Sequence, residues 1–505
     1  MSANGNAAIY FVDRHISEGR AEKTAFVEGD RSLTYGELAD QSGRIVTLYN
    51  RHGLRQEDRA AMLVLDVVEF PIIFWGSLKA GVVPVAINTL LTTEQYRYIL
   101  SDSRARALFI SAPLLETVRP ILGDLPHLQA IFVVGGQDPA GQDFAAELAA
   151  SDPAPVAQVS SDDTAFWLYS SGSTGDPKGV RHVHSALQAT SDTYGARVLG
   201  IREDDVIYSA AKLFFAYGLG NGMTFPMSVG ATAALLPTRP TPQSVGGIMQ
   251  SVEPTIFCGV PTLYAAMLAS VEDSLPGTNR LRVSISAGEA LPAEIGNRWR
   301  EITGTDILDG VGSTEMLHIF LSNAPGSVEY GTSGVAVPGY DLRLVDPDGA
   351  EVGPDEVGEL LVNGASASDG YWNQREKSRN TFEGAWTRTG DKYTRREDGR
   401  YVYCGRTDDM FKVSGQWVSP FEVEQALISH PAVLEAAVVP AMDEEGLEKP
   451  KAFIVLKDGA DAPTDGALKD HVKQAVGNWK YPRWIETVED LPKTATGKIQ
   501  RFKLR

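Results

Sequence analysis

The sequence predicts an α/β protein with two domains: a large N-terminal domain of parallel sheets covered by helices, and a small α+β domain at the C-terminal end. Its 505 residues exceed the size of one typical hydrophobic core. The first third alternates strand-like and helix-like segments, a rhythm typical of a parallel sheet. Near Gly405 that rhythm stops and a shorter unit begins.

Each expected element of the N-terminal domain follows from its local pattern. Short apolar runs predict strands, and apolar residues at helical spacing predict the helices between them. The strands are expected at 61–65, 82–87, 107–111 and 164–169, and the helices at 69–80 and 93–102. The stretch 135–163 is rich in Asp, Pro and Ala, so we expect a surface excursion there.

The C-terminal domain begins where turn-forming residues interrupt the pattern. Thr407, Asp408 and Asp409 follow a strand that ends at 401–404, and few bulky side chains there would resist rotation. Beyond them, helices are expected at 420–428 and 467–476, and strands at 435–439, 452–456 and 484–488. About a hundred residues suffice for a small α+β domain. We therefore expect domains at 1–407 and 408–505.

Composition excludes several classes of protein and partner. The formal net charge of −19 creates a field that repels nucleic acid and anionic membranes. Cys258 and Cys404 lie far apart in no metal-ligand spacing, which argues against a disulfide scaffold or a zinc site and suits the reducing cytoplasm. Neither a signal-peptide core nor an uninterrupted membrane-spanning run is visible, so we expect a cytoplasmic protein.

The last fourteen residues are locally basic in this acidic chain. Residues 492–505 contain no Asp or Glu, and their cationic residues are Lys493, Lys498, Arg501, Lys503 and Arg505. An enzyme that binds anionic substrates would need such local positive charge. A solvated basic tail is the alternative interpretation.

A glycine- and hydroxyl-rich segment follows directly on the strand expected at 164–169. Residues 169–180 read Tyr-Ser-Ser-Gly-Ser-Thr-Gly-Asp-Pro-Lys-Gly-Val. Glycines let backbone N–H groups approach phosphate oxygens, hydroxyls donate further hydrogen bonds and Lys178 adds charge. Pro177 and Gly179 depart from the Walker A pattern, which needs glycine and Ser or Thr there. A surface turn remains the alternative.

This segment resembles the phosphate loop of the acyl-adenylate-forming superfamily, which includes acyl-CoA synthetases, peptide-synthetase adenylation domains and luciferases. Five further motifs resemble that superfamily in its own order along essentially the whole chain. They are 286–292 (Ser-Ala-Gly-Glu-Ala-Leu-Pro), 309–315 (Asp-Gly-Val-Gly-Ser-Thr-Glu), 386–391 (Trp-Thr-Arg-Thr-Gly-Asp), 405–412 (Gly-Arg-Thr-Asp-Asp-Met-Phe-Lys) and 492–498 (Pro-Lys-Thr-Ala-Thr-Gly-Lys). Each motif is weak singly, but six in sequence identify the superfamily.

The resemblance implies a nucleotide site that holds ATP and Mg²⁺. Ser173 and Thr174 would hold the β- and γ-phosphates, Thr314 the α-phosphate, and Glu315 the Mg²⁺, a hard ion suited to carboxylate oxygens. Asp391, assisted by Arg406, would accept hydrogen bonds from the ribose hydroxyls, although a surface ion pair is the alternative. The other nucleotide-binding residues implied are Ser171, Gly172, Gly175, Lys178, Gly288, Glu289, Ala290, Asp309, Gly310, Gly312 and Ser313.

The same resemblance implies a two-step reaction with a moving C-terminal domain. Lys498 would stabilise the anions that meet when a carboxylate attacks the α-phosphate. Asp408 matches the family's hinge, and rotation there would remove Lys498. It would bring coenzyme A-binding residues toward the site, and those expected are Lys412, Ser414 and Gly415. The thiol of coenzyme A would then displace AMP.

The acid site is expected to be lined by Phe215, Ala216, Tyr217, His318 and Ile319. Many superfamily members carry histidine where Phe215 stands, so any gating by that histidine is in doubt. The segments 212–222 and 309–323 resemble benzoate–CoA ligases in particular. Their glycine, alanine and aromatic residues would leave a flat apolar slot for a planar ring. A purely structural role for 214–219 and for His318 is the alternative. His182 and His184 are expected to pack beside the phosphate loop.

The prediction is therefore an aryl–CoA ligase that takes an aromatic acid, ATP and coenzyme A. A freestanding adenylation enzyme that loads a carrier protein would share the fold. A nucleotide sensor that has lost catalysis is a second alternative, against which intact Glu315, Asp391 and Lys498 speak. Ring substituents stay open, because one methyl or hydroxyl changes discrimination by only ~1–3 kcal/mol in an apolar pocket. The oligomeric state is also open, with a homodimer among the alternatives.

Overall fold

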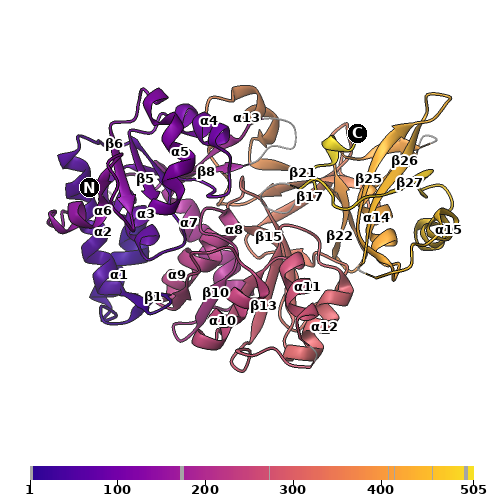
Figure 1. The fold of residues 1–505 in the computed structure, drawn as a ribbon, viewed down its shortest axis with the longest axis horizontal. Helices are drawn as coiled ribbons and strands as arrows, with labels where there is room; N and C mark the ends of the chain where they lie inside the picture. The colour runs from indigo at the N-terminus through magenta and orange to yellow at the C-terminus, as the bar shows by residue number, and fades with distance from the viewer. Residues whose placement is uncertain are drawn as a thin grey trace. The chain divides into compact units, whose positions relative to one another are not determined.

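The computed structural model describes residues 4–170, 176–271, 273–407, 409–413, 416–457, 459–493 and 499–505 (Figure 1). The chain forms two compact units. The first comprises Met1–Ser171, Asp176–Asp341 and Val362–Thr387, and the second comprises Gly172–Gly175, Leu342–Leu361 and Arg388–Arg505. The domain boundary expected at 407 to 408 stays a prediction, because Asp408 lies outside the described residues.

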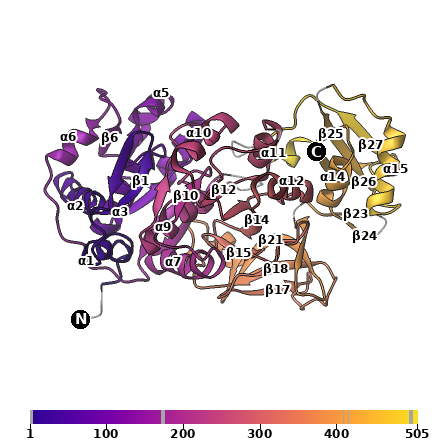
Figure 2. The ribbon, with the colours of Figure 1, turned by 90° about the horizontal axis from the view of Figure 1, so that it is seen from below.

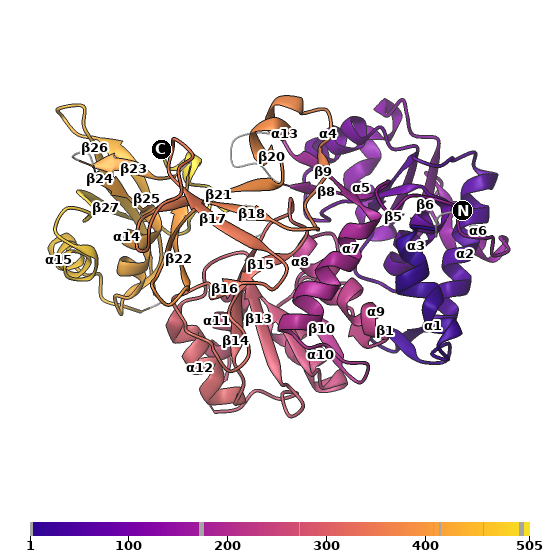
Figure 3. The same cartoon turned by 180° about the vertical axis from the view of Figure 1, so that it is seen from behind.

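The first unit contains an eight-stranded sheet in the order β19-β9-β8-β4-β3-β5-β6-β7. Its strands are β3 (Arg59–Leu63), β4 (Val83–Ala86), β5 (Ala107–Ser111), β6 (Ala130–Val134), β7 (Gln142–Asp143), β8 (Thr164–Ser170), β9 (Lys178–Val183) and β19 (Gly370–Tyr371). Its central strands β8, β4, β3, β5 and β6 are parallel neighbours, and β9 returns antiparallel to β8 beside α7 (His184–Thr190; Figure 3). The expected parallel sheet is confirmed.

A second, nine-stranded sheet of the first unit has the order β16-β15-β14-β13-β12-β10-β11-β1-β2. Its strands are β1 (Thr24–Glu28), β2 (Arg31–Thr34), β10 (Val206–Ser209), β11 (Thr232–Ala234), β12 (Ile256–Gly259), β13 (Val283–Ala287), β14 (Ile307–Gly312), β15 (Ile319–Ser322) and β16 (Val335–Ala336). The strands from β11 through β14 are parallel, whereas β15 returns antiparallel to β14. The carboxyl ends of the parallel strands therefore share one edge, where α/β enzymes place their ligands.

Helices of the first unit connect and cover these strands. They are α1 (Arg14–Ser17), α2 (Tyr35–Arg51), α3 (Glu69–Ala80), α4 (Thr93–Ser103), α5 (Leu115–Val118), α6 (Phe144–Ala149), α8 (Ala216–Leu219), α9 (Phe225–Val229), α10 (Pro242–Val252), α11 (Pro261–Ala269), α12 (Ala293–Thr303) and α13 (Arg375–Thr381). The helix expected at 69–80 is α3, buried from Phe70 to Lys79 because almost all its side chains are apolar. It ends at Gly81, whose φ of 70° suits a left-handed C-cap.

The second unit contains most of a five-stranded sheet, of which strand β20 belongs to the first unit, together with a small α+β fold. This five-stranded sheet has the path β17-β18-β21-β20, with β22 paired to β21. Its strands are β17 (Asp341–Val345), β18 (Gly358–Asn363), β20 (Phe382–Glu383), β21 (Trp386–Arg395) and β22 (Tyr401–Arg406). The hairpin of β23 (Phe411–Val413) and β24 (Gln416–Val418) follows. The three-stranded sheet β25-β26-β27 then packs with two helices (Figure 2).

This last sheet has its own core, as a small domain requires. Its elements are α14 (Pro420–Ile428), β25 (Val433–Met442), β26 (Glu448–Leu456), α15 (Asp465–Val476) and β27 (Trp484–Thr487). The helix expected at 420–428 has those bounds, whereas the strand expected at 435–439 is longer at both ends. Part of the surface excursion expected at 135–163 instead forms β7 and α6. None of the helices in the described residues is long and apolar enough to cross a membrane.

Candidate functional site

One polar cluster in the first unit joins the expected phosphate loop to the expected metal ligand. Tyr371 donates its hydroxyl to Oε1 of Glu315 across 2.8 Å. Lys178 Nζ lies 4.0 Å from that same oxygen and 4.5 Å from the centre of the Tyr371 ring. Strand β19 brings Tyr371 there, because it pairs antiparallel with β9, which begins at Lys178. The structure thus brings together Lys178 and Glu315, two residues that the sequence predicted.

Two buried histidines, His182 and His184, follow Lys178 along the chain. His182 Nε2 lies 2.9 Å from the carbonyl oxygen of Thr314, and Nδ1 of His184 accepts a hydrogen bond from the backbone N–H of Ala7. Burial lowers the pKa of each imidazole to about 4, so both are neutral at physiological pH. Residues 171–175 of the phosphate loop lie outside the described residues, so the expectation that both histidines pack beside that loop stays a prediction. Ser313, also expected at the site, accepts a hydrogen bond from the N–H of Met316.

The expected adenine side lies at the carboxyl ends of β13 and β14. Their register pairs Ser286 with Asp309 and Ala287 with Gly310. Gly288, just beyond β13, has φ of 97°, where any side chain would be strained. Burial raises the pKa of Asp309 to about 8. Among the described residues, Asp309 Oδ1 and Ser286 Oγ are buried without a hydrogen-bond partner, and an exocyclic amino donor suits such oxygens.

The expected acid-binding residues come from α8 and from the start of β15. Tyr217 donates its hydroxyl to the carbonyl oxygens of Gly259 and Ile285, at 3.1 and 3.0 Å. His318 is 2% exposed, and its ring lies 5.8 Å from that of Tyr217, 5.2 Å from Tyr194 and 4.5 Å from Phe225. The structure therefore brings Tyr217 and His318 together inside an aromatic cluster.

His318 is held in an unusually apolar position for a histidine. Neither of its ring nitrogens makes a well-formed hydrogen bond to a described residue, and burial lowers its pKa to about 3 against an opposing interaction with the Tyr217 backbone. Gly220 makes room for it, because a Cβ there would lie 2.4 Å from Cδ2 of the imidazole. Ile319 packs on Gly310 in the same way. The imidazole is consequently a neutral, polarisable ring packed among aromatic neighbours rather than a charged group.

The segment before α8 is anchored by a buried ion pair that sequence reasoning missed. Asp66 follows β3, and its Oδ1 accepts the backbone N–H of Leu213 at 3.2 Å while Oδ2 lies 3.7 Å from Lys212 Nζ. The ammonium also donates to the carbonyl oxygens of Leu236 and Thr238. Because β3 and β11 belong to different sheets, Lys212 ties both sheets to the segment that leads to Ala216. Phe215 and Ala216 pack partly buried against the main core.

The expected ribose-binding pair lies in the second unit. β21 and β22 place Asp391 opposite Arg406, whose Nη1 donates to Asp391 Oδ1 at 2.9 Å and to the carbonyl oxygen of Thr389 at 3.0 Å. The guanidinium is 40% exposed and the carboxylate 17% exposed. An exposed pair of this kind contributes only about 0–1 kcal/mol to stability. The effect of Arg406 is rather to hold the Asp391 carboxylate, a hydrogen-bond acceptor, in one orientation.

Both flanks of the expected catalytic lysine are tied down within the second unit. Gln500 donates its N–H to the carbonyl oxygen of Pro492 at 2.7 Å, and Lys493 pairs across a β-bridge with Ile499. Arg501 holds the buried carboxylate of Glu424 with two nitrogens, at 2.9 and 2.7 Å, and reaches Asp409 at 3.3 Å. These ion pairs connect the end of the basic tail to the residue after the expected hinge.

Several expected site residues fall outside the described residues: Ser171, Gly172, Ser173, Thr174, Gly175, Asp408, Ser414, Gly415 and Lys498. For Lys412 the structure gives the backbone, which pairs in β23 with Trp417 of β24. Tyr371, Asp66 and Arg501 were missed because their partners lie 56, 147 and 77 residues away, and no local pattern signals such pairings.

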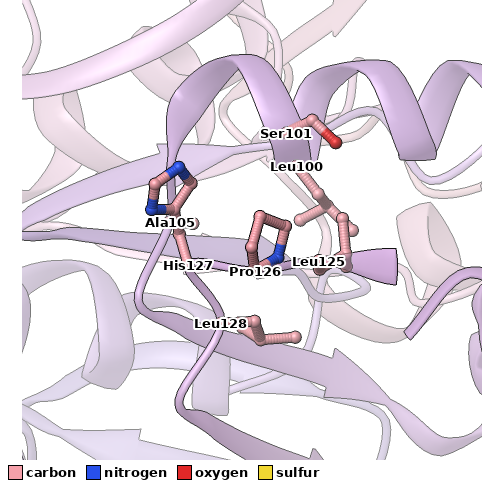
Figure 4. Close-up of a pocket in the computed structure, with 7 residues that line it drawn as sticks. All are labelled: Leu100, Ser101, Ala105, Leu125, Pro126, His127 and Leu128. Atoms are coloured by element: carbon pink, nitrogen blue, oxygen red, sulfur yellow. The ribbon is translucent and has the colours of Figure 1, made fainter. Parts of the chain in front are cut away.

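A small recess elsewhere in the first unit carries no chemistry of this kind (Figure 4). It is lined by Leu100, Ser101, Ala105, Leu125, Pro126, His127 and Leu128. Its lining is largely aliphatic, and it lies between the end of α4 and the segment before β6. The nucleotide and acid motifs all lie elsewhere along the chain.

Two parallel sheets that carry the expected phosphate-, adenine- and acid-side residues near their strand ends are consistent with an enzyme that binds a nucleotide and activates an acid. Residues 13–372 match the family of AMP-binding enzymes, and residues 422–498 match the AMP-binding enzyme C-terminal domain. This chain belongs to the AMP-binding, adenylate-forming enzyme family.

Relatives of known activity match along the full length. The chain is 56% identical to a 4-hydroxybenzoate–CoA/benzoate–CoA ligase of Rhodopseudomonas palustris, over 99% of this chain and 94% of that protein. It is 55% identical to a benzoate–CoA ligase of Thauera aromatica, over 99% and 95%. A crystal structure of a benzoate CoA ligase from Burkholderia xenovorans LB400 aligns with a TM-score of 0.90 at 50% identity, covering 99% of each chain. The expected resemblance to the superfamily is confirmed.

Proposed function

We propose that this protein is an AMP-forming aryl–CoA ligase, which joins benzoate or a ring-substituted benzoate to coenzyme A through an acyl-adenylate. The observation that carries the proposal is the aromatic cluster in which the His318 ring contacts those of Tyr217, Tyr194 and Phe225, with Ala216 next to Tyr217 at the start of α8. Identities of 55–56% to benzoate-activating ligases over the full length support it.

In the first half-reaction the acid attacks the α-phosphate of ATP and releases diphosphate. No general base is required, because a carboxylic acid is already ionised at neutral pH. Thr314 and Lys178 would bind phosphate oxygens, and the backbone from Gly288 to Ala290 would flank the adenine. The buried, unpaired Oδ1 of Asp309 fits the adenine amino group.

The residues present also fit a magnesium ion. The Glu315 side chain is 16% exposed, and its Oε2 carries no hydrogen bond to any described residue, while Oε1 is held by Tyr371. Magnesium takes one or two carboxylates and completes its shell with phosphate oxygens and water. When bound, the ion would neutralise charge on the phosphates. Glu315 would hold it beside them.

The second half-reaction forms the thioester. Lys498 would stabilise the adenylation transition state and then leave by rotation of the C-terminal domain about Asp408. The segment containing Lys412, Ser414 and Gly415 would take its place, and the thiolate of coenzyme A would attack the acyl carbon. The carbon–sulfur bond forms as the bond to AMP breaks.

A panel of acids tests this function directly. We expect benzoate and its hydroxyl derivatives to support ATP–diphosphate exchange, and to release AMP only when free coenzyme A is added. Aliphatic acids of similar size serve as the matched control and should be poor substrates. Exchange without CoA-dependent AMP release would instead identify an enzyme that loads a carrier protein. Absence of exchange with every acid would identify a nucleotide-binding protein without catalysis.

A further inference from the structure

Tyr371 occupies a fixed position between the two charged groups of the phosphate side. Its ring is 5% exposed and lies 5.4 Å from that of Phe382, and its backbone N–H donates to Ser378 Oγ at 3.0 Å. The antiparallel register of β19 with β9 sets Tyr371 opposite Val180. Because strand pairing and packing both restrain the residue, its hydroxyl has a defined location.

That hydroxyl binds one oxygen of Glu315 and leaves the other uncommitted. The 2.8 Å hydrogen bond goes to Oε1, the oxygen that faces Lys178 at 4.0 Å. The backbone of Glu315 is held independently, because its carbonyl oxygen accepts the N–H of Ser368 at 2.7 Å. The orientation of the carboxylate, by contrast, depends on Tyr371.

The orientation of the Glu315 carboxylate matters because the ammonium of Lys178 lies close to it. That ammonium lies 4.5 Å from the centre of the Tyr371 ring, whose electron-rich face attracts a cation, and it donates to the Tyr371 hydroxyl oxygen at 3.5 Å. At 4.0 Å from Glu315 it is at the limit of an ion pair. Without the phenol hydroxyl, the carboxylate would be free to turn onto the ammonium, and each would then neutralise the other.

We propose that Tyr371 is a positioning residue for the metal–nucleotide site: its hydroxyl fixes Glu315 so that Oε2 is presented to the magnesium ion of the bound nucleotide, and its ring and hydroxyl together hold the ammonium of Lys178 beside that carboxylate. This inference rests on the proposed function. It predicts that Tyr371 acts on magnesium dependence and leaves the affinity for the acid alone.

Tyr371→Phe keeps the ring and removes the hydroxyl. We expect the magnesium concentration at half-maximal benzoate-dependent ATP–diphosphate exchange to rise about tenfold, which is the loss typical of one hydrogen bond to a charged group. The KM for benzoate should change less than twofold. Conversion of supplied benzoyl-adenylate to the thioester should be unaffected, since that step follows diphosphate release.

Tyr340→Phe is the matched control. Tyr340 is 6% exposed, and its hydroxyl lies 2.7 Å from Ser366 Oγ, which donates to the carbonyl oxygen of Met316. It therefore supports the backbone beside Glu315 without touching the carboxylate. We expect this variant to lose about as much thermal stability as Tyr371→Phe while retaining the wild-type magnesium dependence.

Binding of Mn²⁺ provides a readout that does not depend on turnover. With α,β-methylene-ATP present, the electron paramagnetic resonance signal of free Mn²⁺ should disappear at lower protein concentration for wild type and Tyr340→Phe than for Tyr371→Phe. Equal Mn²⁺ affinity in Tyr371→Phe and wild type would overturn the inference, as would an equal loss in both variants. If wild type shows no acid-dependent exchange, the proposed function fails, and the Mn²⁺ titration still decides the role of Tyr371.

Discussion

The expected phosphate side and the expected acid side of the first unit satisfy their polar groups in different ways. On the phosphate side, Glu315, Tyr371 and Lys178 contact one another. On the adenine and acid side, Asp309 Oδ1 and both ring nitrogens of His318 are buried with no partner among the described residues. The first group is held in place by contacts within the protein and leaves Oε2 of Glu315 open to a ligand, whereas the second group keeps buried polar atoms without a well-formed hydrogen bond to a described residue.

This difference indicates how the two sides work. A buried polar atom without a partner costs about 1–3 kcal/mol, so folded proteins rarely keep several together. They do so where a ligand supplies the missing partners. We infer that the phosphate side is preorganised by its own side chains, and that the acid and adenine side gains its hydrogen bonds only on binding.

The largest expected effect breaks the anchor of the acid side. Lys212→Met removes the cation beside Asp66, whose pKa burial already raises to about 6. Loss of one partner from a buried pair typically costs about 3–5 kcal/mol. We expect the first transition in urea unfolding to move to much lower urea, and KM for benzoate to rise more than KM for ATP.

The double variant Lys212→Met with Asp66→Asn is the control for this pair. Asn keeps an acceptor for the N–H of Leu213 but carries no charge. It should recover most of the lost stability. If the double variant is as unstable as Lys212→Met, packing by the lysine stem matters more than its charge.

The next effect tests whether preorganisation of the phosphate side is sufficient for adenylation. Lys498→Ala should reduce benzoate-dependent ATP–diphosphate exchange by about 10²–10³-fold, the loss typical of one group that stabilises transition-state charge. Thioester formation from supplied benzoyl-adenylate should persist, because Lys498 is expected to be absent from that step. Equal loss of both half-reactions would remove the assignment. Lys503→Ala, in the same basic tail, is the matched control.

A smaller effect is expected from filling the acid side. Ala216→Val adds two methyl groups where the acid is expected to bind, and close-packed sites respond to such changes by about 1–3 kcal/mol. Ring-substituted benzoates should lose more kcat/KM than benzoate, while KM for ATP stays the same. A uniform loss over all acids would indicate core damage, and an unchanged acid profile would place Ala216 outside the pocket.

The smallest effect concerns the protonation of His318. Its pKa is about 3 in the folded protein and near 6.5 when unfolded, so below pH 6.5 only the unfolded state takes up the proton. Stability should therefore be full above pH 6.5 and fall as the pH drops toward 3, by about 1.4 kcal/mol per pH unit for each such histidine. His318→Phe should make the decline shallower by one proton, as measured by urea unfolding between pH 5 and 7. The exposed His127→Gln controls for substitution of a histidine.

The sequence predicted local elements well where one pattern dominated. The helices expected at 69–80 and 420–428 and the strand expected at 107–111 have those bounds in the structure. It missed the hairpin of β23 and β24 and the strands β17 and β18. Short strands with mixed polar residues lack the clear period that apolar runs provide, and their formation depends on neighbouring strands.

For the site, the sequence determined which chemical groups are available and in what order they occur. Six motifs identified the family, because phosphate, ribose and acid chemistry restricts which residue types can stand at the motif positions. The roles of Lys498 and Asp408 rest on that order alone, since both lie outside the described residues.

Only the tertiary structure decided which groups act together. Pairing of β19 with β9 brings Tyr371 to Glu315, the fold brings the segment after β10 to Asp66 so that Lys212 contacts it, and folding of the tail brings Arg501 to Glu424. Each pairing spans more than fifty residues, beyond the reach of local propensity. The physical reason is that a side chain's partner is set by strand pairing and packing, whereas its chemistry is set by its own residue type.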